Sequence, residues 1–61
     1  MTEFHSEITH RAARAVASLH RAEQAGDDYL VEIRRAELEG LARIAAEHGL
    51  RIPDLRGYSA A

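Results

Sequence analysis

Glu7 and His10 stand three residues apart, the spacing at which a carboxylate and an imidazole bind metal in di-iron four-helix proteins. That chemistry requires both side chains to face the interior of a bundle. Ile8 marks the apolar side of the same segment, so a helix here turns Glu7 and His10 away from the interior. The 4 histidines share no zinc-ligand spacing, and the sequence has no cysteine. We therefore expect neither a bound metal nor another cofactor.

Basic side chains recur along one side of the first half of the chain. This basic stripe consists of His10, Arg11, Arg14 and Arg21, with Ser18 beside it. Presented twice in a symmetric dimer, the stripe would suit a phosphate backbone, so RNA or DNA binding is the alternative function. Neighbouring acidic residues and the scarcity of aromatic side chains favour a solvated helix face instead.

Arg34 lies near the centre of the apolar side of the second half of the chain. Burying a lone guanidinium is costly, so Arg34 needs a carboxylate partner or an opening to solvent. In one interpretation it pairs with Glu37, within a chain or between two chains, and fixes the register of the helices. In the other, Arg34 is an anion clamp in a groove that receives a partner.

The sequence matches no catalytic motif. It has no Gly-rich phosphate loop, no nucleophile elbow and no Ser/His/Asp order. A chain of two short helices also has little room for a substrate pocket of several hundred Å³. We expect no enzymatic activity.

Apolar residues at spacings of three and four predict a first helix over about residues 3–25. Its apolar side consists of Phe4, Ile8, Ala12, Ala15, Leu19 and Ala22, with Val16 at the edge. Thr2 or Ser6 is placed to cap its start. The alanines allow a facing helix to approach closely, but they add little hydrophobic stabilisation.

Gly26 predicts the end of this helix, because glycine adopts the left-handed conformation without a Cβ clash. Asp27 or Asp28 then caps a second helix over about residues 28–48. A turn as short as residues 26–28 makes the two helices antiparallel neighbours. The sequence therefore predicts an all-α helical hairpin as a single domain.

Gly49 repeats the stop signal, and a tail follows over residues 50–61. Pro53 excludes the tail from the helix. The residues expected to fold back over the open end of the bundle are Leu50, Ile52 and Leu55. Residues 59–61 are expected to fray. In an alternative, the tail stays disordered until a partner binds it.

The second helix carries more apolar surface than the first helix can cover, since its apolar residues occupy about half of its circumference. A chain of 61 residues without cysteine is also hard to stabilise alone. Pairing two hairpins into a four-helix bundle buries the surplus. The predicted core and interface residues are Ile8, Val16, Leu19, Leu30, Ile33, Arg34, Glu37, Leu38, Leu41 and Ile44.

A formal net charge of −2 argues against a general polyanion binder. The first residues lack a cationic segment followed by an apolar one, and no apolar run approaches the roughly 20 residues of a membrane span. We expect a cytoplasmic homodimer, away from membranes, that works as a small interaction or regulatory module. A second alternative is an accessory subunit whose second helix meets a different protein.

Overall fold

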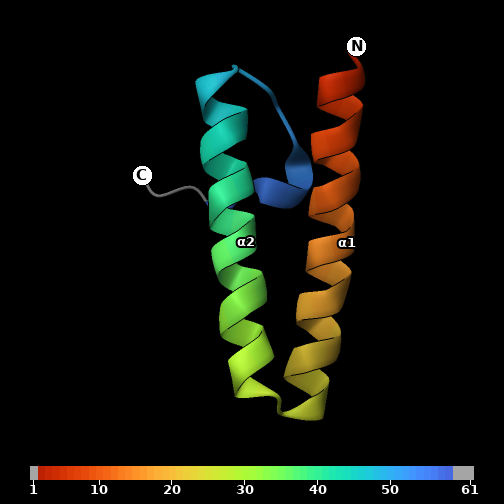
Figure 1. The fold of residues 1–61 in the computed structure, drawn as a ribbon, viewed down its shortest axis with the longest axis vertical. Helices are drawn as coiled ribbons and strands as arrows, with labels where there is room; N and C mark the ends of the chain where they lie inside the picture. Colours follow the sequence, from red (N-terminus) through yellow and green to blue (C-terminus); the bar gives the residue numbers. More distant parts are fainter. Residues whose placement is uncertain (1, 59–61) are drawn as a thin grey trace.

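The computed structural model describes residues 2–58, which form two antiparallel helices and a short tail (Figure 1). Helix α1 spans Glu3–Ala25 and helix α2 spans Asp28–Glu47. A single 3₁₀ turn, η1, spans Pro53–Leu55. No strand occurs within the described residues. The structure confirms the all-α, two-helix part of the predicted fold, and the helix ends agree with prediction to within one residue.

Side chains cap the start of both helices. The Thr2 hydroxyl accepts a hydrogen bond of 3.1 Å from the backbone N–H of His5, so Thr2 is the cap of α1. A carboxylate oxygen of Asp27 accepts from the Leu30 N–H at 3.1 Å and caps α2. Gly26 between the helices has φ of 70°, in the left-handed region that other residues adopt only at a cost.

The end of α2 is a Schellman motif, as the sequence predicts. The backbone N–H of Leu50 donates to the Ala45 carbonyl at 2.8 Å, and the N–H of Gly49 donates to the Ala46 carbonyl at 3.2 Å. Gly49 has φ of 67°. Leu50 packs against the core of the hairpin, where this motif places its apolar contact.

Two glycine substitutions should change stability in opposite directions. Gly26→Ala is expected to cost about 1–2 kcal/mol, because alanine is strained at positive φ. Gly40 lies inside α2, and a Cβ there would meet nothing within 4 Å. Gly40→Ala is therefore expected to add about 0.5–1 kcal/mol of stability. Urea unfolding followed by circular dichroism measures both changes, and a stabilised Gly26→Ala chain would contradict this description of the turn.

The core lies along the line of contact between the two helices. Its helical residues are Ile8, Ala12, Ala15, Leu19 and Ala22 of α1, and Leu38, Leu41, Ala42 and Ala45 of α2. Leu38 is completely buried. Phe4 continues the predicted apolar side of α1 but stays 42% exposed, with its ring centroid 4.8 Å from that of His48. The predicted apolar side of α1 is therefore buried except at its first residue.

The tail returns from the end of α2 and packs against both helices (Figure 1). Ile52 is 7% exposed and Leu55 is 5% exposed, so both belong to the core. Leu50 and Tyr58 are partly buried against it. The docked tail was one of the two predicted alternatives, and the structure shows it. The prediction that residues 59–61 fray lies outside the described residues.

The predicted position of the tail is wrong in one respect, because it lies along the side of the hairpin and not over its open end. Arg56 and Tyr58 line a hollow with Leu19 and Arg35, which lie far from the open end on α1 and α2. The reason is the small size of the core alanines, because they leave space beside the helices. The large side chains of the tail fill that space.

The docked tail covers part of the apolar surface of α2. The sequence predicted that a second chain would cover this surface, but η1 and the residues around it bury part of it within the same chain. Among the described residues of α2, the large apolar side chains that stay exposed are Tyr29, Ile33 and Ile44. Neither helix of residues 2–58 is long and apolar enough to cross a membrane.

Candidate functional site

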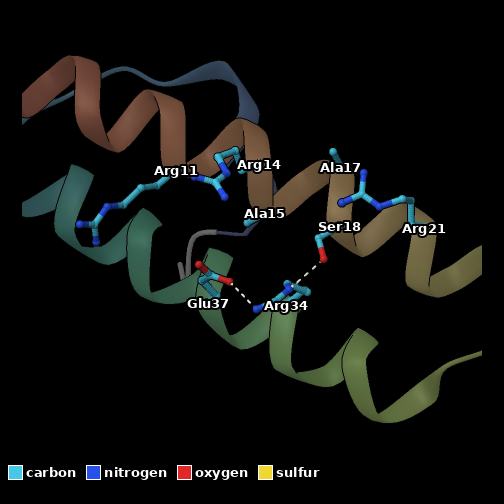
Figure 2. Close-up of a pocket in the computed structure, with 8 residues that line it drawn as sticks. All are labelled: Arg11, Arg14, Ala15, Ala17, Ser18, Arg21, Arg34 and Glu37. Carbon is cyan, nitrogen blue, oxygen red and sulfur yellow. Dashed lines mark hydrogen bonds and ion pairs between the residues drawn. The ribbon is translucent and has the colours of Figure 1, made fainter.

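A hollow of about 590 Å³ lies between α1 and α2 on the side of the hairpin opposite the tail (Figure 2). It is larger than the expectation of little room between two short helices allowed. We call it the arginine cleft. It is lined by Arg11, Arg14, Ala15, Ala17, Ser18, Arg21, Arg34 and Glu37. Four of these side chains are guanidinium groups and one is a carboxylate, so the formal charge of the lining is +3, from 4 arginines minus 1 glutamate.

Arg34 joins the two helices across the floor of the cleft. Its Nε donates to the Ser18 hydroxyl at 2.9 Å, and its Nη1 donates to Oε1 of Glu37 at 3.0 Å (Figure 2). The side chain of Arg34 is 33% exposed, so the guanidinium keeps contact with solvent. The Arg34–Glu37 pair is therefore present within one chain, and the bond to Ser18 ties α2 to α1 at one register.

The other three arginines come from α1. Arg11 forms an ion pair of 2.7 Å with Glu7, and both side chains are more than half exposed. Figure 2 shows the Arg11 side chain extending along α1 towards its N-terminal end, where Glu7 lies one turn away. Arg14 and Arg21 form no ion pair with any residue in 2–58 and are exposed. Their positive charges are therefore uncompensated by the described part of the chain.

Apart from Glu37, which lines the arginine cleft, the glutamates of α2 lie away from it. Glu39 lies in the hollow beside the tail, together with Glu23 of α1. Glu32 and Glu47 are exposed, and helical geometry turns them away from Arg34. The net charge of −2 for the whole chain thus conceals a positive side.

Most of the predicted basic stripe lines the cleft, but His10 does not. Arg34 is the residue that joins the arginines of α1, and the sequence argument considered it separately. Whether Arg34 lines the cleft depends on how the two helices are rotated relative to each other. The sequence pattern of either helix alone does not predict that rotation.

The predicted interface residues separate into two groups. Ile8, Leu19, Leu38 and Leu41 are buried within the hairpin, and Val16 is partly buried against the same core. The others face the side of α2 that the tail leaves open, next to Arg34 and Glu37. We call the apolar residues of this side the α2 seam: Leu30, Ile33 and Ile44, with the buried Leu41 at the edge that adjoins the core.

Ile33 and Ile44 are the exposed residues of the α2 seam, at 38% and 37%. Leu30 is half-buried, and Leu41 is only 7% exposed because it also packs in the hairpin core. The seam lies beside the arginine cleft along α2, and Glu37 stands at its middle. An apolar strip and a basic hollow therefore share the open side of the hairpin.

Glu7 and His10 are both exposed on α1, as expected for outward-facing side chains. Within residues 2–58, no group of three or more histidine, aspartate and glutamate side chains is arranged to hold a metal ion. Glu7 instead pairs with Arg11. The expectation that purified protein carries no stoichiometric iron or manganese stays a prediction for metal analysis.

Two further hollows flank the docked tail, one beside Ile52 and Pro53 and the other beside Tyr58. Both hollows lie where the tail contacts the helices, so the arginine cleft is the stronger candidate site. Comparisons of the chain with models of protein families, with curated proteins and with solved structures find no match.

Proposed function

We propose that the chain is a small, non-enzymatic interaction module that works in the cytoplasm as a homodimer paired through the α2 seam. The observation that carries this proposal is the exposure of two isoleucines, Ile33 and Ile44, on a side of α2 that neither α1 nor the tail covers. Exposed apolar side chains arranged along one side of a helix are typical of helix–helix contacts.

The spacing of the seam suits a second copy of the same chain. In an antiparallel pair with its two-fold axis at Glu37, Leu30 meets Ile44 of the other copy, because each lies seven residues from the axis. Ile33 meets Leu41 in the same way, four residues from the axis. A self-complementary surface of this kind is what a two-fold symmetric dimer requires.

The extent of the seam sets the expected strength of association. From Leu30 to Ile44 it is about 21 Å long at 1.5 Å per residue. One pair of such helical strips is smaller than the roughly 800 Å² per partner of a standard protein interface. We therefore expect a dimer that forms at micromolar concentrations.

Sedimentation of the purified chain between about 1 and 500 μM tests this proposal. The wild type is expected to shift from monomer to dimer across the series, and its Tm to rise with concentration. Ile33→Glu combined with Ile44→Glu is expected to stay monomeric, because two carboxylates per chain would be brought into the interface. Ala13→Glu adds charge on the exposed outer side of α1 and should leave the dimer intact.

A monomer at every concentration, with a Tm independent of concentration, would contradict the homodimer. Precipitation or irregular aggregation of the wild type, cured by the two glutamate substitutions, would instead favour an accessory subunit whose seam meets a different protein.

A further inference from the structure

The arginine cleft offers donors that the fold does not use. Arg14 and Arg21 form no ion pair within residues 2–58. Arg34 donates through Nε and Nη1 to Ser18 and Glu37, which leaves its Nη2 edge without an acceptor in the described part of the chain. A guanidinium held by two hydrogen bonds is already oriented, so little conformational freedom is lost when its free edge binds an anion.

We propose that the arginine cleft binds the phosphate backbone of a single-stranded nucleic acid. Guanidinium groups match the geometry of phosphate oxygens and bind them through two parallel hydrogen bonds. Backbone amides and helix ends play no part here, because the cleft is lined by side chains along the middle of both helices.

The length of the cleft favours a chain of phosphates over a single anion. Arg11 and Arg21 are ten residues apart on α1, or about 15 Å at 1.5 Å per residue. Arg14 lies between them on the same side, and Arg34 faces them from α2. Charges placed at intervals along a groove track a polyanion, as basic grooves do in proteins that bind single strands.

The shape of the site favours one strand over a duplex. The lining forms a hollow between two helices, with Ala15, Ala17 and Ser18 as its small side chains. One strand can enter such a hollow, whereas the cylinder of a duplex would rest on the helices at its rim. The lining has no aromatic side chain on which bases could stack, so binding should depend little on base sequence.

Two other occupants fit the cleft less well. A protein partner usually inserts a large apolar or aromatic anchor, and the cleft presents only alanines for such an anchor to contact. A second copy stacked over this side would bring two sets of four arginines together, and the repulsion would be costly. All the residues of the proposed site come from one chain, so the site does not require the proposed dimer.

Fluorescence anisotropy with a labelled single-stranded RNA of about 12 nucleotides and mixed sequence tests the proposal. At about 50 mM salt the wild type is expected to bind saturably, with a slope of log K against log salt of about −2 to −3, because each phosphate contact on a single strand contributes about −0.7. Arg14→Glu combined with Arg21→Glu is expected to weaken binding at least tenfold and to reduce the slope by about 1.4.

The matched control is Arg43→Glu combined with Arg51→Glu. It makes the same change in net charge at two exposed residues that do not line the cleft, and should change affinity less than twofold. Circular dichroism establishes that both variants are helical. If the glutamates disturb α1, Arg14→Gln with Arg21→Gln removes the same two contacts and should lower the slope by the same amount.

Three results would overturn the proposal. The first is no saturable binding of the RNA by the wild type below about 100 μM in low salt, where nonspecific affinities lie. The second is an equal loss of binding in the cleft variant and in the control, which would indicate general charge attraction. The third is equal affinity for poly-glutamate, or higher affinity for a duplex of the same length, since either would assign the cleft to a different ligand.

Discussion

Leu38→Ala is expected to destabilise the chain by about 2–5 kcal/mol, the cost of truncating a completely buried leucine to alanine. Leu38 is the largest side chain that the hairpin buries completely, and three of the five core residues of α1 are alanines. The cavity left behind would therefore lie where alanines cannot expand to fill it. A domain of this size has only about 3–9 kcal/mol of total stability, so a large share of the molecules would unfold.

Urea unfolding, followed by the helical circular-dichroism signal, measures the change in the free energy of unfolding that Leu38→Ala causes. Tyr29→Ala is the control, because Tyr29 also lies on α2 but is 78% exposed and leaves no cavity. Its cost should stay below about 1.5 kcal/mol. Equal losses for the two variants would show that Leu38 is not the centre of the core.

The second large effect is expected from Ile52→Ala combined with Leu55→Ala, which removes the two buried side chains of the tail. Each truncation alone should cost about 2 kcal/mol or more, and the two should couple because they fill the same space beside the core alanines. With a change of about 4–8 °C in Tm per kcal/mol for a domain of this size, the double variant should melt well below the wild type.

Arg51→Ala serves as the control for the tail, since Arg51 is exposed between the docked residues. It should leave Tm within a few degrees of the wild type, as surface substitutions usually do. An unchanged Tm in the double variant would mean that the tail does not contribute to the core in solution, and would favour the alternative in which a partner binds it.

The local features of the fold could be predicted from sequence because each depends on a few adjacent residues. Gly26 and Gly49 mark the two helix ends through their conformational preference, and Asp27 marks a helix start through its carboxylate. The periodicity of α1 likewise identified its buried side. None of these features requires knowledge of how the helices meet.

The arrangement of the candidate site could be predicted only in part. The arginines of α1 share one side of a helix, and spacing alone reveals that. Arg34 lies on the other helix, and its approach to Ser18 follows from the rotation of α2 about its own axis, which packing decides. The position of the tail was missed for the same reason, because the space beside Ala42 and Ala45 exists only after the helices have packed.

Asp27 serves both helices at once, because its backbone N–H donates to the Ala22 carbonyl at 2.9 Å while its carboxylate accepts from Leu30. These contacts join residues at most five positions apart, so they can form before any distant part of the chain has been found. Folding should accordingly start at the turn between the helices and proceed along both of them. It should take the microseconds to milliseconds typical of helical proteins with short-range contacts. The tail, whose partners are distant in sequence, would then dock as the closing step.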